Sequence, residues 1–285
     1  MTSKQGRCDL HTHTQASDGM NLPSENVKLA KDMGLSGIAI TDHDTVAGVA
    51  EALKAGRELG IAVVPGVEIS TSQMGQDIHV LGYYINTQDE QLLHRLQELR
   101  SLRDRRNEMI LANLNKLGIS LVMDEVIAGL GRPLQEDESI GRPHIADALV
   151  RKGRAKDLRD AFDKYLAEGA SAYATLPKIT PGEAVSWIRE SGGAPVLAHP
   201  GIYGNDALML EILQEHPWAG IEAYHSDHSP DQEAKYLQWA ERLELIPTGG
   251  SDYHGIRQGM VFHGEIGNRS VPLHTIEQLR EQAGC

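Results

Sequence analysis

The chain has 285 residues, of which 40% are hydrophobic and 24% charged, and its formal net charge is −13. This is the composition of a globular protein with one large domain, or one domain and a small insert. The acidic balance argues against long nucleic acid as a partner, because phosphate contacts usually require a basic face. It leaves room for a small phosphorylated substrate, since bound cations create a local positive site.

Location is indicated by what the sequence lacks. No apolar run is long enough to cross a bilayer, and residues 1–9 lack the apolar core of a signal peptide. The two cysteines, Cys8 and Cys285, are expected as free thiols of a reducing compartment. We therefore expect a cytoplasmic protein with no membrane partner. The oligomeric state does not follow from the sequence.

Short apolar runs alternate with amphipathic helical patterns in the first part of the chain and again in the last part. Strands are predicted near residues 8–10, 37–40, 61–64, 78–85, 194–198, 220–223 and 245–247. Helices are predicted over residues 23–33, 46–59, 180–191, 206–215 and 230–243. About seven such units indicate an α/β fold with a parallel sheet, an incomplete or distorted barrel rather than the eightfold form.

The middle of the chain breaks this alternation. It shows only helical patterns, over residues 89–117, 124–130, 144–152 and 158–166. We interpret residues 89–168 as a small helical insertion domain over the mouth of a barrel that residues 1–88 and 169–285 form.

Residues of the metal-ligand type follow almost every predicted strand, where barrels of this kind place their active sites. They are His11, His13, Asp18, Asp42, His43, Asp44, Glu68, His79, His199, His225, His228, Asp252 and His254. His11 and His13 are one residue apart, so both side chains of an extended segment point the same way. A mixture of imidazole and carboxylate favours Zn, Mn or Fe over Mg or Ca.

Each of these short motifs also has an ordinary structural explanation. Asp42 and Asp252 have the chemistry of helix caps, Glu68 has that of a surface carboxylate, and His199-Pro200 suits a turn. Five or six strand ends carry such residues, however, and unrelated caps and turns would not recur so regularly. The recurrence therefore favours one metal centre.

Taken together, the motifs resemble those of the PHP superfamily, which is named for polymerase and histidinol phosphatase. The matching segments are His11-Thr12-His13, Thr41-Asp42-His43-Asp44, Glu68, His79, Ala198-His199-Pro200 and Ser251-Asp252-Tyr253-His254. The resemblance covers residues 8–86 and about 170–255. It implies a distorted (β/α)7 barrel with two or three divalent cations, of which Mn is the first choice and Zn or Fe the alternatives.

The resemblance also implies a ligand set for each cation. The first would take His11, His13, Glu68 and Asp252; the second Glu68, His79 and His199; the third Asp18, His43 and His254. Many relatives have histidine at the position of Asp18, which makes this third set the least regular.

The expected reaction is hydrolysis of a phosphate ester, in which a hydroxide between the first two metals attacks phosphorus. Glu68 would set the spacing of that metal pair. His225, or else His228, would protonate the leaving oxygen. Asp44 would orient a neighbouring ligand.

Basic residues indicate the substrate. Arg142, Lys178 and Arg257, with His144 in the same Gly-Arg-Pro-His segment as Arg142, suit a second phosphate, although any one of them has the chemistry of an ordinary surface residue. The combination resembles PHP nucleotide phosphatases that act on 3′,5′-bisphosphates. The resemblance implies removal of the 3′-phosphate from a substrate such as pAp, giving the 5′-monophosphate.

Three alternatives remain at this point. The first is 5′→3′ exonuclease action on short RNA, which the low aromatic content disfavours. The second is histidinol phosphatase, which requires an acidic pocket for an ammonium group. The third is a non-enzymatic metal-binding domain, which the nearly complete set of ligand motifs argues against.

Overall fold

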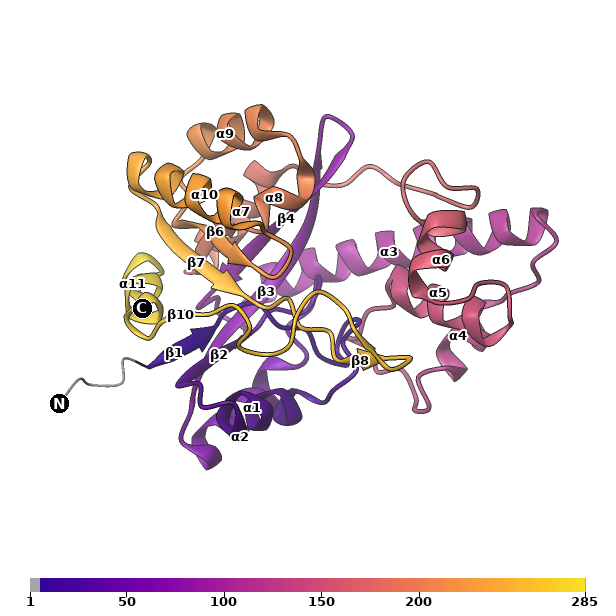
Figure 1. Cartoon of the computed structure of the whole chain (residues 1–285), viewed down its shortest axis with the longest axis horizontal. Coiled ribbons are helices and arrows are strands. Elements are labelled where there is room, and N and C mark those ends of the chain that lie inside the picture. The colour runs from indigo at the N-terminus through magenta and orange to yellow at the C-terminus, as the bar shows by residue number, and fades with distance from the viewer. Residues whose placement is uncertain (1–5, 285) are drawn as a thin grey trace.

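An eight-stranded sheet forms the centre of the computed structural model, which describes residues 6–284 (Figure 1). Its strand order is β10-β1-β2-β3-β4-β5-β6-β7. The strands are β1 (Arg7–Asp9), β2 (Gly37–Ile40), β3 (Ala62–Gln73), β4 (Gln76–Tyr83), β5 (Ala194–Leu197), β6 (Gly220–His225), β7 (Ile246–Gly250) and β10 (Val271–Pro272). The helices around this sheet are α1 (Pro23–Asp32), α2 (Val49–Leu59), α7 (Pro181–Glu190), α8 (Pro200–Tyr203), α9 (Asp206–Glu215), α10 (Pro230–Arg242) and α11 (His274–Gln282).

Backbone hydrogen bonds between the two sides of the sheet nearly close it into a barrel. The amide of Leu10, just after β1, donates to the carbonyl of Gly249 in β7 at 3.1 Å. The amide of Asp252 then donates to the carbonyl of His11 at 2.9 Å. The prediction of a distorted α/β barrel is therefore confirmed.

The strand β4 departs from the predicted parallel arrangement. It pairs antiparallel with both β3 and β5, because a two-residue turn joins it to β3. Both turn residues, Met74 and Gly75, have positive φ angles (51° and 82°), as tight hairpins with the twist of a sheet require. β3 is also much longer than predicted, so Glu68 lies inside this strand and not after it.

Predicted helix starts on the barrel are explained by their caps. Thr180 and Ser229 each precede a proline in the first helical position, and their hydroxyls accept bonds from the amides of Glu183 (3.3 Å) and Gln232 (3.2 Å). The last part of the chain carried no predicted elements. It contains the strands β8 (Ile256–Arg257) and β9 (Met260–Val261), which are too short to show a periodic pattern, besides β10 and α11.

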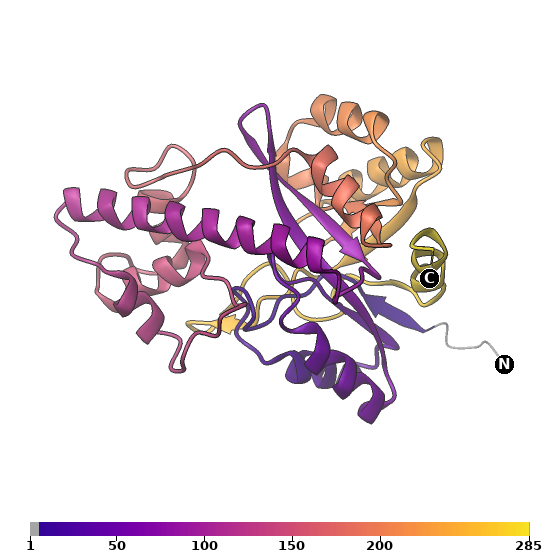
Figure 2. The ribbon, with the colours of Figure 1, turned by 180° about the vertical axis from the view of Figure 1, so that it is seen from behind.

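Between β4 and β5, the chain forms a series of helices joined by loops as far as residue 166. These helices are α3 (Glu90–Lys116), α4 (Met123–Ala128), α5 (Arg142–Arg151), α6 (Leu158–Ala161) and the π-helix η1 (Phe162–Leu166). Figure 2 shows α3 running from beside the sheet out to the shorter helices. Buried side chains of this segment form an apolar cluster of their own, which includes Ile110, Leu114 and Leu149. Its definition as an insertion domain stays a prediction.

Two further expectations concern location. Within residues 6–284, no helix is both long and apolar enough to cross a membrane. Cys8 is a free, buried thiol in β1, whereas Cys285 lies outside the described residues.

Candidate metal centre

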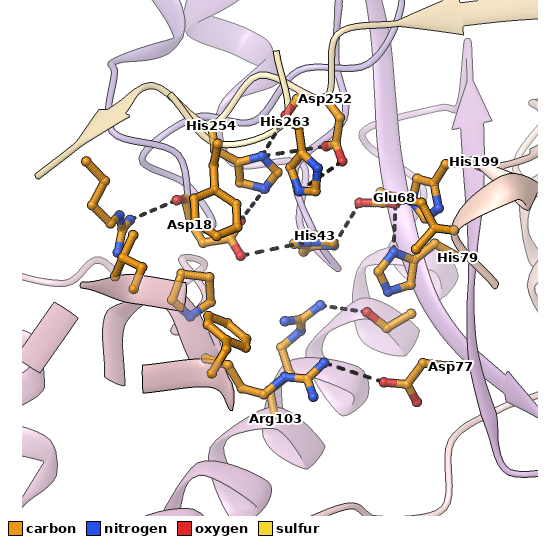
Figure 3. Close-up of a pocket in the computed structure, with 18 of the residues that line it drawn as sticks. Asp18, His43, Glu68, Asp77, His79, Arg103, His199, Asp252, His254 and His263 are labelled. Atoms are coloured by element: carbon orange, nitrogen blue, oxygen red, sulfur yellow. Dashed lines mark hydrogen bonds and ion pairs between the residues drawn. The ribbon is translucent and has the colours of Figure 1, made fainter. Parts of the chain in front are cut away.

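Strand ends and two neighbouring strands bring the nine predicted ligands to one side of the barrel. His11 and His13 follow β1, His43 follows β2, and His199 follows β5. Glu68 and His79 come from the interiors of β3 and β4 and face the same space. In Figure 3, Glu68 lies between His43 and His79. The remaining three ligands are Asp18, Asp252 and His254, which come from the loops after β1 and β7.

The first group of donor atoms is His11 Nε2, His13 Nε2, Glu68 Oε2 and Asp252 Oδ1. The two imidazole nitrogens are 3.2 Å apart. They lie 3.5 and 3.3 Å from the Glu68 oxygen, and 3.4 and 3.1 Å from the Asp252 oxygen. Ligand atoms about 2.1 Å from a tetrahedral ion lie about 3.4 Å from one another. The group therefore has the spacing of a cation site.

The two carboxylate oxygens of Glu68 face different histidines. Oε1 lies 2.8 Å from His79 Nδ1 and 3.1 Å from His199 Nε2. Oε2 lies 2.9 Å from His43 Nδ1 and also faces the first group. This arrangement suits a carboxylate that is shared by two cations.

Several of these buried atoms lack hydrogen-bond partners. Glu68 Oε2, Asp252 Oδ1 and His43 Nδ1 are buried and make no hydrogen bond, although they lie close to other ligand atoms. A buried charged oxygen without a donor is costly, and a cation removes that cost. These donor sets therefore fit bound divalent cations by their own chemistry.

Burial opposes ionisation of Glu68, but the imidazoles of His79, His43 and His11 outweigh it and hold the pKa of the carboxyl well below its usual range. Burial likewise opposes ionisation of Asp252, and neighbouring imidazoles, with His263 first, hold its pKa low. Both carboxylates are thus charged, as metal ligands must be.

The third group of proposed ligand atoms, around Asp18, is more widely spaced than the first. Asp18 lies 3.3 Å from His254 Nε2, 3.8 Å from His43 Nε2 and 3.9 Å from His13 Nδ1. The structure therefore places Asp18 beside its predicted partners.

Backbone strain accompanies the cluster. His199 and Asp252 have φ angles of 23° and 53°, a region that non-glycine residues rarely occupy. Such strain persists only where the surrounding structure holds it, which is typical of functional sites.

Sequence reasoning missed Glu222, whose carboxylate orients two of the ligands. It lies 3.0 Å from Nδ1 of His11 and accepts the amide of His199 at 2.8 Å. The residue is fully buried in β6. An acid inside an otherwise apolar strand, Gly-Ile-Glu-Ala-Tyr-His, was the sequence feature that could have revealed it.

Neither of the two predicted proton donors lines the cavity next to the cluster. His225 is the last residue of β6, is fully buried, and has Nε2 3.3 Å from Asp252. Both ring nitrogens of His228 bond to the backbone, at the carbonyl of Ala223 (3.0 Å) and the amide of Gly201 (3.1 Å). The assignment of His228 to proton transfer is corrected, because no ring nitrogen is left for a substrate.

A cavity of about 430 Å³ opens beside the ligands, and cationic side chains form part of its lining. Its cationic side chains are Arg103, Arg106, Arg142, Lys178 and Arg257. His144 does not line it; Nδ1 of His144 accepts the amide of Gly141 at 3.0 Å at the start of α5. The predicted substrate role of His144 is therefore corrected to capping of this helix.

Two of these cations, both on α3, were not predicted. Arg103 donates to Asp44 Oδ2 at 2.6 Å and to the hydroxyl of Ser70 at 2.6 Å. Asp44 therefore orients an arginine and not a metal ligand, which corrects that prediction. Nothing in the charged pattern of a long surface-type helix distinguishes such arginines beforehand.

Arg106 is the least satisfied charge in the cavity. It is 7% exposed, its Nε has no partner, and a terminal nitrogen of its guanidinium donates to the neighbouring Asn107 amide oxygen at 3.0 Å. Burial, together with the charges of Arg103 and Arg142, lowers the pKa of this guanidinium to about 9. A buried cation of this kind fits an anionic ligand.

Comparisons with known proteins agree with the geometry. The PHP domain family matches residues 9–176. A 3′,5′-nucleoside bisphosphate phosphatase of Chromobacterium violaceum is 34% identical over 255 residues, which cover 88% of each chain. The 5′-3′ exoribonuclease Rnm of Escherichia coli is 35% identical over 252 residues, covering 86% of this chain and 84% of the relative. A solved structure of a candidate metal-dependent phosphoesterase from Bifidobacterium adolescentis has a TM-score of 0.88, 30% identity, and coverage of 98% and 96%.

Proposed function

We propose that this chain, which belongs to the PHP domain family and is a metal-dependent phosphoester hydrolase, removes the 3′-phosphate from nucleoside 3′,5′-bisphosphates such as pAp. The product would be the 5′-monophosphate. One observation carries the proposal: the metal-ligand cluster and the unpaired, buried Arg106 face the same cavity. A substrate with two phosphates would place one at the metal-ligand cluster and the other at Arg106. The name of the Chromobacterium violaceum relative supports this choice.

The ligand groups support two or three cations. We assign the first to His11, His13, Glu68 and Asp252, the second to Glu68, His79 and His199, and the third to Asp18, His43 and His254. Manganese is our first choice, with zinc or iron as alternatives, because the donors are imidazoles and carboxylates. When bound, such cations lower the pKa of water and neutralise charge on phosphoryl oxygens.

The protein's own side chains would bind and orient the rest of the substrate. Arg106 would hold the 5′-phosphate through charge-assisted hydrogen bonds, and Arg142 and Lys178 would contribute further donors while keeping Asp77 as a second partner. Arg103 is already fixed by Asp44, so it would meet a phosphoryl oxygen with little loss of side-chain freedom. Arg257 also lines the cavity and donates to the carbonyl of Asp18 at 2.9 Å.

We propose His263 as the side chain that protonates the leaving oxygen, in place of His225 and His228. His263 lines the cavity and pairs with Asp227. Burial opposes its protonation, but the carboxylates of Asp252 and Asp227 outweigh it and raise the pKa of His263. An imidazole that pairs with a carboxylate and lines the cavity has the geometry to give its proton to the leaving oxygen.

The alternatives meet the cavity differently. Exonuclease action on short RNA stays a candidate because the Escherichia coli relative is a 5′-3′ exoribonuclease. Histidinol phosphatase is disfavoured. Apart from the proposed ligands, the acid lining the cavity is Asp77, which lies 2.8 Å from Lys178 and 3.6 Å from Arg142 and is thus already paired.

A substrate panel tests the proposal. With Mn²⁺ present, phosphate release would be compared for pAp, AMP, histidinol phosphate and a 5′-phosphorylated RNA trinucleotide. Glu68→Gln serves as the inactive control, because it removes the charge of the shared ligand. The highest kcat/KM is expected for pAp. Equal rates on all four, or preferred release of mononucleotides from the RNA, would overturn the assignment.

Two further proposals concern the domain organisation and the location of the enzyme. We treat residues 89–168 as a helical insertion domain, because its buried side chains form a separate apolar cluster and Arg142 reaches the cavity from it. We place the enzyme in the cytoplasm on the grounds of its cysteine content.

A further inference from the structure

The chain contains only two phenylalanines, and both line the cavity beside the metal ligands. Phe162 begins the π-helix η1, and Phe262 directly follows β9, so the two come from segments far apart in the sequence. Both side chains are half-buried and pack against the apolar cluster of the helical segment. Each ring thus packs against the apolar cluster, while part of its surface stays exposed.

Other apolar side chains extend this part of the lining. Leu158 lies four residues before Phe162, the spacing that places two side chains on one face of a helical turn. Pro143, in the first turn of α5, also lines the cavity. Phe162, Phe262, Leu158 and Pro143 together are called the apolar wall below.

The backbone at Phe162 has an unusual form. Its carbonyl accepts the amide of Ala167 at 2.8 Å, five residues ahead, as in a π-helix. Single π-turns of this kind are uncommon and occur often at functional sites. The aromatic ring thus starts a distorted turn at the edge of the cavity.

The apolar wall is a poor site for phosphate and a good one for an aromatic heterocycle. Its four side chains carry no hydrogen-bonding group, so they cannot replace the water around a charged group. Aromatic rings stack on any nucleobase, because every base has a π-face.

We infer that Phe162 and Phe262 position the nucleobase of the substrate by stacking. This inference rests on the proposed function, since it concerns the part of the substrate between and beside the two phosphates. Phe162 and Phe262 are positioning residues, because they act on binding and orientation and not on the reacting phosphorus.

The first test uses the wild-type enzyme and needs no variant. The values of kcat/KM would be measured for pAp and for an abasic ribose analogue with the same two phosphates. The abasic analogue should be about ten- to a hundredfold poorer, mainly through KM, which is the size of effect expected for one stacked base.

Variants then assign the effect to the two rings. Phe162→Leu and Phe262→Leu keep apolar volume and remove the aromatic face, so each should reduce the preference of pAp over the abasic analogue, and the double variant should abolish it. Tyr165→Leu is the matched control, because Tyr165 is a half-buried aromatic of the same π-helix that does not line the cavity. The Tyr165→Leu variant should prefer pAp over the abasic analogue as strongly as the wild type does.

The outcomes separate the two proposals. If pAp and its abasic analogue are hydrolysed equally well, the bisphosphatase function stands and the stacking inference fails. A double variant that keeps the wild-type preference also overturns the inference. If no bisphosphate is hydrolysed while another substrate of the panel is, the proposed function fails and the inference fails with it.

Discussion

The carboxylate of Glu222 lies 3.0 Å from Nδ1 of His11, and both side chains are fully buried. The contact makes Nδ1 the protonated nitrogen and turns Nε2 toward His13 and Asp252. A charged residue inside an apolar strand thereby sets the tautomer and direction of a proposed metal ligand.

Replacing this carboxylate should weaken metal binding. Glu222→Gln keeps the shape of the side chain but removes its charge, and loss of such an orienting partner costs about 10- to 100-fold in metal affinity. Metal content after dialysis against a graded chelator series would measure the change. Glu211→Gln, at an exposed position of α9, is the control and should bind metal like the wild type. Equal metal affinity in both variants would remove Glu222 from this role.

Removal of the metals should abolish activity and lower thermal stability together. A ligand at 100 times its dissociation constant stabilises the folded state by about 2.7 kcal/mol. Without cations, one buried oxygen of each of two carboxylates, Glu68 Oε2 and Asp252 Oδ1, has no hydrogen-bond donor. Thermal unfolding with and without chelator would show the loss, and added Mn²⁺ should restore both stability and activity. Activity that survives complete metal removal would contradict the proposed mechanism.

Replacing Arg106 should weaken substrate binding without lowering the stability of the protein. Arg106→Met removes a buried, unpaired charge, so the free energy of unfolding should stay the same or rise. Loss of a charged hydrogen bond worth about 1.5–3 kcal/mol should raise KM for pAp about 10- to 100-fold. KM for a 3′-monophosphate should barely change. Arg142→Ala should show the same selectivity between the two substrates, and an equal effect on both would remove these residues from the second-phosphate site.

His228 should contribute to stability alone. Its ring nitrogens bond to the Ala223 carbonyl and the Gly201 amide, so His228→Ala should cost about 1–3 kcal/mol of unfolding free energy by leaving these groups unpaired. The KM for pAp and the pH profile of kcat should remain those of the wild type. His94→Ala, at an exposed position of α3, provides the reference for a neutral histidine replacement. A shifted pH profile in the His228 variant would restore it as a proton donor.

The pair of Asp44 and Arg103 should make stability depend on pH. Burial raises the pKa of Asp44, but Arg103 and the Ser70 amide outweigh it and leave it below the usual value. The stability from this pair is therefore present above the unfolded-state pKa of about 3.9 and is lost as the pH falls through the lower folded-state value. Asp44→Asn removes the carboxylate partner of Arg103, whose side chain is 11% exposed, and should cost about 3–5 kcal/mol at pH 7. Denaturant unfolding would measure the difference in unfolding free energy between the wild type and Asp44→Asn. This difference should stay unchanged from pH 7 to 5 and narrow below about pH 4. A difference that stays constant over the whole range would exclude the ion pair as its source.

The gathering of the proposed metal ligands at one side of the barrel could be predicted because local rules decide it. His11 and His13 flank one residue in an extended segment, so both side chains face one side. Ends of neighbouring strands meet at one edge of a barrel, which gathers residues distant in the sequence. The antiparallel β4 was not foreseen, because its direction depends on a two-residue turn without a strong sequence signature.

The substrate side of the site depended on tertiary structure. Arg103 and Arg106 lie on a 27-residue helix whose sequence is rich in charge, and only the packing of α3 beside the barrel decides which arginines enter the cavity. His144 has the chemistry of a phosphate ligand, yet its ring caps a helix start. The sequence by itself therefore determined which histidines and carboxylates gather in clusters able to bind metals, since strand periodicity is local. The proposed second-phosphate site and the apolar wall arise only where helices, loops and barrel meet, because burial and pairing of a side chain are properties of the whole fold.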